Sequence, residues 1–264
     1  MQNPISRKRA FEGVRNFRDF GGYAGSGGRT MATGRFFRSA NYAQASDADL
    51  AHLAALGITA IIDLRRPEER TRMPSRRWPE FAAEVIENHD DDEGAGPMSW
   101  HGFMADWDLS TEGMKAYHLS YYERAPTLPR LHDLYARYFR RLANSEGPIV
   151  VHCAAGKDRI GIICALTHTL AGVHRDDIIA DFLLTNDPAV FDVHAPLWQA
   201  EIARERGRAP SMETMHVAMG VHESYLDRAF QVIDETYGGV DRYLGDVLGI
   251  DAATRAKLEH KLFD

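Results

Sequence analysis

The chain has 264 residues, of which 44% are hydrophobic and 26% charged, a balance typical of folded globular proteins and unlike that of disordered or fibrous chains. The 31 Lys and Arg residues against 38 Asp and Glu residues give a formal net charge of −7, which argues against a general binder of nucleic acid or anionic membranes. Only two cysteines are present, so the chain is not a disulfide scaffold and suits a reducing compartment.

The sequence shows neither a membrane span nor a secretory signal. The longest uncharged apolar run, residues 160–174, contains Thr and His and is shorter than the roughly 18–20 residues that a span requires. Basic residues near the N-terminus are not followed by the apolar stretch of a signal peptide. We therefore expect a cytoplasmic protein, while export by a route that needs no signal peptide stays open.

The first half of the chain predicts one helix and two strands after a turn-rich start. Residues 1–30 combine glycine and arginine in the pattern of short extended pieces and turns. Ser46 can cap a helix whose apolar residues recur at helical spacing until Gly57. The run 58–62 is short and β-branched, as in a strand that ends at Asp63. Further expected segments are a strand at 83–86, an exposed loop at 89–97 and an irregular or helical insertion at 98–128.

The second half predicts a buried strand between helices, followed by a helical end. Apolar residues at every third or fourth position indicate an amphipathic helix over 131–142. The apolar run 149–151 is typical of a buried parallel strand, and a helix follows over about 159–170. The rest is helical in pattern, with Pro188 and Pro196 as interruptions. One helix face carries Met212, Met215, Met219 and His222, as in a core or in a mobile lid over a pocket.

This order of elements predicts an α/β fold, with a central, mostly parallel sheet flanked by helices. No internal repeat or low-complexity segment divides the chain. We therefore expect a single domain over 1–264, in which 98–128 is an insertion and 187–225 a helical lid.

A segment with the properties of an anion-binding loop lies between the predicted strand and helix. Residues 151–161 are Val-His-Cys-Ala-Ala-Gly-Lys-Asp-Arg-Ile-Gly. At such a turn the backbone N–H groups and the start of the helix attract anions and favour a thiolate. Cys153 can then act as a nucleophile, and the planar fork of Arg159 can hold two phosphate oxygens. Gly156 allows a backbone conformation that a Cβ would hinder.

Four segments, in order, match the motifs of a known family. They are Asn-Phe-Arg-Asp-Phe-Gly-Gly at 16–22, Gly-Arg-Phe-Phe-Arg-Ser at 34–39, Ile-Asp-Leu-Arg at 62–65 and the loop at 152–159. Over nearly its whole length the chain resembles the atypical bacterial tyrosine phosphatases of the mycobacterial secreted phosphatase B type, within the Cys-X5-Arg phosphatases. The resemblance implies a protein-tyrosine-phosphatase-like fold with no metal or other cofactor.

The resemblance also implies roles for individual residues. Cys153 would be the nucleophile, Arg159 would bind phosphate and Asp158 would be the general acid. Asp63 and the run 90–92 are the rival acids, although 90–92 is more typical of a solvated turn. Substrate-binding positions are expected at Ala154, Ala155, Gly156, Lys157, Ile160, Asp63, Arg65, Arg18 and Arg38, the last two from the resemblance alone.

Other notable residues favour structural interpretations. Cys164 lies among apolar residues of the predicted helix, as a core residue does. The arginine-rich run 65–77 is typical of a solvated segment, although Arg65 ends a strand at the edge where α/β sheets bind ligands. The 12 histidines show no metal-binding spacing, so we expect no metal site.

The leading hypothesis is a metal-independent phosphomonoesterase that acts on phosphotyrosine through a cysteinyl-phosphate. Its partners would be a phosphorylated protein or a phospholipid headgroup, with phosphate or another oxyanion in the loop. Phosphoserine, phosphothreonine and phosphoinositide stay open as substrates, but Ala154 stands where many lipid phosphatases have a further lysine. Ile160 stands where many relatives have Ser or Thr, which can donate to the departing thiolate. Two alternatives follow: a phosphate-binding pseudo-phosphatase with slow or absent turnover, and a rhodanese-type thiol transferase.

Overall fold

A five-stranded sheet forms the centre of the structure. The computed structural model describes residues 11–90 and 100–263. β1 pairs antiparallel with β2, and the other neighbouring strands are parallel, which confirms the expected mostly parallel α/β sheet. The strands are β1 (Arg18–Asp19), β2 (Phe36–Ser39), β3 (Ala60–Asp63), β4 (Glu84–Ile86) and β5 (Ile149–His152), in the order β1-β2-β5-β3-β4.

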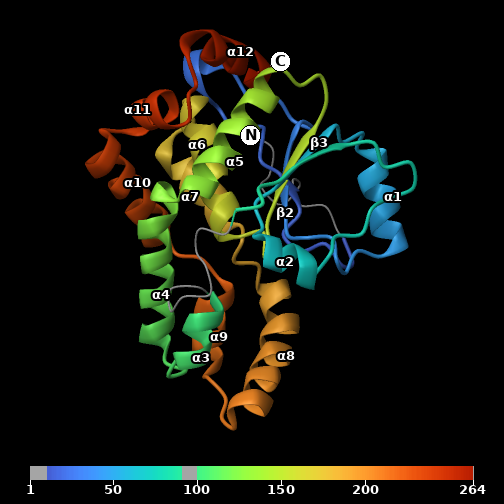
Figure 1. Ribbon diagram of the computed structural model, residues 1–264, viewed down its shortest axis with the longest axis vertical. Coiled ribbons are helices and arrows are strands. Elements are labelled where there is room, and N and C mark those ends of the chain that lie inside the picture. Colours follow the sequence, from blue (N-terminus) through green and yellow to red (C-terminus); the bar gives the residue numbers. More distant parts are fainter. Residues whose placement is uncertain (1–10, 91–99, 264) are drawn as a thin grey trace.

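The two faces of the sheet bury different cores, because successive side chains of a strand point to opposite faces. Ile62 and Val151 belong to the larger core, whereas Ile61 and Val150 belong to the smaller one. The smaller core packs against α1 (Asp47–Ala55), which begins after Ser46 with a capping box. In Figure 1, α1 lies on one side of the sheet, and α5, α6, α7 and α10 lie on the other.

Helices from the second half of the chain enclose the larger core. Their buried or partly buried apolar residues pack in one cluster with side chains of β2, β3 and β5 on one face of the sheet. This side of the sheet therefore holds the larger of the two cores, to which Cys153 and Ile160 also belong. The helices are α5 (Pro129–Ala143), α6 (Asp158–Leu170), α7 (Arg175–Leu183), α10 (Glu223–Tyr237), α11 (Val240–Arg242) and α12 (Ala252–Phe263).

A third apolar cluster joins the two segments that the sequence set apart as insertion and lid. Met114 of α4 (Thr111–Arg124) and Met215 of α9 (Met212–Met219) are both fully buried in it. The cluster also includes residues of α3 (Trp100–Asp106) and α8 (Pro188–Arg206). These four helices form the lower end of the molecule in Figure 1. Movement of 187–225 as a lid stays a prediction.

Several details differ from the sequence-based expectations. Pro196 does not interrupt α8, which runs through it, and Pro188 occupies the first turn of that helix. The methionine face is divided, since Met215 is buried but Met212 is 37% exposed. The expected loop at 89–97 lies outside the described residues from position 91 onward. Among the helices that are described, none has the length and apolar character needed to cross a membrane.

Candidate active site

The loop between β5 and α6 lies at the carboxyl edge of the parallel strands. β2, β3 and β5 pair in register, so Ser39, Asp63 and His152 end side by side at this edge. Cys153 follows β5 directly and is 2% exposed. α6 begins at Asp158, so its N-terminal N–H groups, which have no partner within the helix, face the loop. The loop thus occupies the edge at which α/β sheets bind ligands.

Side chains from outside the loop hold two of its carbonyl groups, those of Ala154 and Gly156. In a trans peptide, the N–H of the following residue points away from the carbonyl. These contacts therefore turn two loop N–H groups away from the supporting side chains and leave them available to an anion. The donors are Asn41 Nδ2 to Ala154 at 2.8 Å, Arg38 Nη2 to Gly156 at 3.3 Å, and Asn16 Nδ2 to Gly156.

Gly156 is required for two separate reasons. Its φ of +72° lies in the left-handed region, where a side chain is strained. A Cβ at this position would also lie 2.6 Å from the Ala40 nitrogen and 2.7 Å from the Ser39 carbonyl carbon. The loop can therefore pack against the end of β2 only because residue 156 has no side chain.

Glu69, in α2 (Pro67–Arg72), binds one edge of the Arg159 guanidinium. Nη1 donates to Glu69 Oε2 at 2.5 Å and to the Leu64 carbonyl at 3.0 Å, and Nη2 donates to Glu69 Oε1 at 2.8 Å. These contacts use three of the five N–H groups of the arginine. The two that remain, on Nε and Nη2, share the other edge of the guanidinium, whose geometry suits two phosphate oxygens.

The charge of Glu69 is stabilised in a buried position. Burial opposes ionisation, but Arg159 and the N–H of Arg66, at 2.8 Å, outweigh it and lower the pKa of Glu69 to about 2. Glu69 therefore stays ionised at neutral pH and keeps the guanidinium in one orientation. Burial acts against the charge of Arg159 too, but Glu69 raises the pKa of the guanidinium well above its ordinary value.

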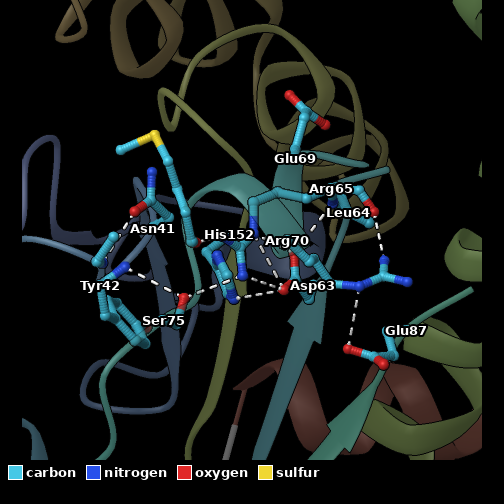
Figure 2. A network of polar contacts seen from close by, with 12 residues as sticks. Asn41, Tyr42, Asp63, Leu64, Arg65, Glu69, Arg70, Ser75, Glu87 and His152 are labelled. Atoms are coloured by element: carbon cyan, nitrogen blue, oxygen red, sulfur yellow. Dashed lines mark hydrogen bonds and ion pairs between the residues drawn. The ribbon is translucent and has the colours of Figure 1, made fainter. Parts of the chain in front are cut away.

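Asp63 is bound in an ion pair with Arg65 at the ends of β3 and β5, as Figure 2 shows. Arg65 donates to both carboxylate oxygens, from Nε at 2.9 Å and from Nη2 at 2.7 Å. Burial opposes the charge of Asp63, but His152, 3.5 Å away, and Arg65 lower the pKa of the carboxyl. A carboxyl that is held ionised inside a buried ion pair is poorly suited to deliver a proton, so this geometry weighs against Asp63 as the acid.

The arginine-rich run is in part buried, contrary to the expectation of a solvated segment. Arg65 and Arg66 are 2% and 4% exposed. Arg70 donates to the Arg65 carbonyl at 2.6 Å and to the Asn88 carbonyl at 2.8 Å, and it pairs with Glu87 (Figure 2). These contacts fix the start of α2, the helix that carries the carboxylate bound to Arg159. Charge alone suggested solvent exposure, but backbone carbonyls and carboxylates satisfy these guanidinium groups inside the fold.

Arg18 and Arg38 lie behind the loop, fully buried, on either side of one carboxylate. Asp181 of α7 accepts from Arg18 Nε at 3.3 Å and from Arg38 Nη1 at 3.0 Å. Burial opposes its charge, but the two arginines lower the pKa of Asp181 to about 2. Because Arg38 also donates to the Gly156 carbonyl, this cluster supports the loop.

Asp158 and Lys157 face elements that the sequence did not connect to the loop. Tyr122 of α4 donates from its hydroxyl to Asp158 Oδ1 at 3.0 Å. Lys157 donates from Nζ to the carbonyl of Ala218 in α9 at 2.9 Å and lies 3.7 Å from Asp158 Oδ2. Burial lowers the pKa of Lys157. Thus both α4 and α9 contact the loop through polar groups.

Two further residues lie in the apolar core, one of them, Cys164, within the field of the Arg18, Arg38 and Asp181 cluster. Ile160 is fully buried in the larger core, as is Cys164. Burial raises the pKa of Cys164 to about 12, which fits the core position expected from the sequence. Among the described residues, no three His, Cys, Asp or Glu side chains lie together as metal ligands.

Sequence reasoning missed the residues that support the loop by tertiary contact. The sequence contained a signal that could have identified Asn16, since this residue opens the first motif, two positions before Arg18. The signal for Glu69 was weaker: it is an acidic residue in the first turn of a helix that begins at Pro67. The sequence offered no signal for Tyr122 or Asp181, because only the packing of α4 and α7 brings Tyr122 to the loop and Asp181 to Arg18 and Arg38.

Comparisons with known proteins show the family to which the chain is related. A model of the tyrosine phosphatase family matches residues 9–264. A Cupriavidus necator protein named as a tyrosine-protein phosphatase is 36% identical over 248 residues, which are 92% of this chain and 85% of that protein. The Mycobacterium tuberculosis triple specificity protein phosphatase PtpB is 30% identical over 273 residues, 93% of this chain and 95% of that protein.

One solved structure, P. aeruginosa TpbA, shares 16% identity, with a TM-score of 0.31, over 70% of this chain and 86% of that one. That likeness is too low to bear on the site. The family match and the two relatives cover nearly the whole chain, and they confirm the resemblance seen in the four motifs. The chain belongs to the tyrosine phosphatase family and is a protein-tyrosine-phosphatase-like hydrolase.

Proposed function

We propose that this phosphatase hydrolyses phosphotyrosine through a covalent phosphate on Cys153, without a metal. The observation that carries the proposal is the orientation of Arg159 beside the loop. Glu69 holds one edge of the guanidinium, and the edge formed by Nε and Nη2 is left for two phosphate oxygens. An anion bound there would also meet the N-terminus of α6 and the N–H groups that the supporting side chains turn away from themselves.

In the first step the Cys153 thiolate attacks phosphorus, and the bond between phosphorus and the tyrosine oxygen breaks. Asp158 gives its proton to that oxygen, so that tyrosine leaves neutral. In the second step water attacks phosphorus, Asp158 accepts its proton, and the bond between sulfur and phosphorus breaks. Inorganic phosphate and the thiolate are the products, and the enzyme returns to its starting state.

The charges around Cys153 suit this chemistry. Arg38, Lys157 and Arg159 each interact electrostatically with its sulfur. A thiolate and a phosphate dianion are both stabilised by such a group of cations, and the transition state carries their combined charge. Arg159 would follow the equatorial phosphate oxygens through both steps, because Glu69 fixes its orientation before substrate arrives.

Phosphotyrosine is the substrate we favour, with a broader range as a subordinate proposal. The name of the M. tuberculosis relative states a triple specificity, which makes phosphoserine, phosphothreonine and phosphoinositide reasonable test substrates here. The loop offers one lysine, Lys157, and its side chain is engaged by the carbonyl of Ala218. With that lysine engaged and Ala154 at the position of the further lysine, a second phosphate group would have few partners at the loop.

The test compares two cysteine variants. Phosphate release from phosphotyrosine, phosphoserine and phosphoinositide substrates is measured in EDTA, and acid-quenched enzyme is weighed by mass spectrometry. We expect release from phosphotyrosine with EDTA present and one added phosphoryl group on the wild type. Cys153→Ser should abolish both, whereas Cys164→Ser, a change at the second, buried cysteine, should keep both. Activity that survives Cys153→Ser, or that EDTA removes and a divalent ion restores, would overturn the proposal.

A further inference from the structure

Asp158 has a partner from a distant helix. The hydroxyl of Tyr122, in α4, donates to Asp158 Oδ1 at 3.0 Å, and the Asp158 side chain is 24% exposed. A carboxyl so close to solvent has several rotamers available unless a neighbour holds it. Tyr122 is fully buried and cannot itself follow a moving carboxylate. The hydrogen bond therefore selects one orientation of Asp158.

The position of Tyr122 is set by tight aromatic packing. Its ring lies 6.1 Å from that of Phe182 at 78° and 5.7 Å from that of Tyr225 at 31°. Gly161, about one helical turn after Asp158, lets the Phe182 ring pack closely against α6 beside Tyr122. A Cβ there would lie 2.6 Å from the Phe182 ring and 3.7 Å from the Tyr122 hydroxyl. One of the two rings that hold Tyr122 in place can therefore pack against the first turn of α6 only because residue 161 has no side chain.

The phenol remains a donor at any pH at which the enzyme would be assayed. Burial, together with Asp158, raises the pKa of Tyr122 well above its ordinary value. Because Oδ1 accepts this hydrogen bond, a protonated Asp158 carries its proton on Oδ2. Lys157 lies 3.7 Å from Oδ2, so the carboxylate that forms when the proton leaves meets a cation at once.

We propose that Tyr122 is the positioning residue for Asp158: it fixes the carboxyl and assigns the transferable proton to Oδ2. This inference rests on the acid role of Asp158 in the proposed function. It explains why a helix of the insertion contacts the loop through a polar group. Tyr122 acts through Asp158 and touches no atom that reacts.

The test is a double-mutant cycle with two substrates. Tyr122→Phe removes only the hydroxyl, and kcat/KM is measured for phosphotyrosine and for p-nitrophenyl phosphate, whose leaving group needs no proton. We expect Tyr122→Phe to lower kcat/KM about tenfold for phosphotyrosine, the scale of one hydrogen bond, and less than about twofold for the nitrophenyl ester. In the Asp158→Asn background the same change should have no effect, because the two residues act as a unit.

Tyr138→Phe is the matched control. Tyr138 is also buried, and its hydroxyl contacts Thr167 Oγ1 at 3.1 Å, away from the loop. Tyr138→Phe should lower the thermal stability about as much as Tyr122→Phe does. It should not change the ratio of kcat/KM between the two substrates. The inference is wrong if Tyr122→Phe slows both substrates equally, or if its effect persists in full in Asp158→Asn. If Asp158→Asn itself does not distinguish the two substrates, the acid role fails first and the inference with it.

Discussion

Glu69 and Arg159 meet through two hydrogen bonds, of 2.5 and 2.8 Å, on the edge of the guanidinium formed by Nη1 and Nη2. An arginine in the first turn of a helix would otherwise lose considerable side-chain entropy when it binds phosphate. Here the carboxylate removes that freedom in advance. The carboxylate comes from a helix 90 residues earlier in the chain, so its function as an anchor depends on the folded structure.

The first prediction concerns the stability of this ion pair in acid. The pKa of Glu69 is about 2 in the folded protein against an ordinary value of 4.5, so the folded state favours the ionised form. The resulting stabilisation is present above pH 4.5 and is lost as the pH falls toward 2. Its scale is about 3 kcal/mol, because each pKa unit corresponds to ~1.4 kcal/mol.

Glu69→Gln cannot titrate, so wild type should exceed it in unfolding free energy by a constant amount above pH 4.5, and the difference should shrink toward pH 2. Denaturant unfolding across this range measures the difference. Glu205→Gln, at an exposed position of α8, is the control and should follow the wild-type curve. A difference between wild type and Glu69→Gln that did not change with pH would show that Glu69 is not held ionised in the folded state.

The sequence predicted the loop well because its signals are local. An apolar strand, a glycine and the start of a helix follow one another within the run 149–161, and α6 begins within one residue of the expected position. By contrast β2 was not expected, since Phe36–Ser39 contains an arginine, which is unusual inside a buried strand. Arg38 is tolerated there because Asp181, 143 residues later, pairs with it.

The residues that support the loop were not predicted either, because they too make contacts between segments far apart in the sequence. Glu69 and Tyr122 reach the loop through the packing of α2 and α4, and no spacing in the sequence encodes either contact. Arg65 was expected near a ligand, but its donors are used by Asp63, by the Met73 carbonyl at 2.6 Å and by Ser75. Local patterns predict the chemistry of the loop, whereas long-range ion pairs and hydrogen bonds determine how the loop is held.

A second prediction concerns the acid. Asp158→Asn should lower kcat/KM for phosphotyrosine by about two to four orders of magnitude and have much less effect on p-nitrophenyl phosphate, because only tyrosine needs a proton as it leaves. Asp63→Asn is the comparison. It removes a charge from the buried pair with Arg65, so it should destabilise the protein and slow both substrates alike. If Asp158→Asn slowed both substrates equally while Asp63→Asn distinguished them, the acid would be Asp63.

A third prediction concerns the contact between the loop and α9. Lys157 donates to the Ala218 carbonyl in the last turn of that helix, where carbonyls lack a partner within the helix. Lys157→Met keeps the aliphatic chain and loses the donor. Amide hydrogen exchange over 212–219 should then speed up by about tenfold or more, since hydrogen bonds to charged groups contribute ~1.5–3 kcal/mol.

Lys115→Met, at an exposed position of α4, is the control for that experiment and should leave exchange over 212–219 unchanged. Exchange in α12, on the far side of the larger core, should be the same in both variants. If Lys157→Met left exchange over 212–219 at the wild-type rate, the contact with Ala218 would not restrain α9, and the lid interpretation of 187–225 would lose its link to the loop.

The last prediction concerns Ile160, which follows Arg159 and is fully buried in the same apolar core as Cys153. Hydrolysis of the phosphocysteine requires sulfur to leave as a thiolate, and a hydroxyl at position 160 would stabilise that charge, whereas Ile160 cannot. With an activated aryl phosphate the first step is fast. The phosphoenzyme should therefore accumulate in the wild type and give a burst of product near one equivalent.

Ile160→Thr should raise the steady-state kcat by roughly tenfold, if one hydrogen bond to the charged sulfur contributes ~1.5 kcal/mol, and should shrink the burst. Stability should fall, because a hydroxyl replaces apolar volume in the core. Ile160→Val also loses apolar volume but gains no donor, so it should keep the wild-type burst and kcat. Rapid-quench kinetics with these three proteins decide the matter. Absence of a burst in the wild type, with the threonine variant no faster, would mean that loop N–H groups or water already stabilise the departing sulfur.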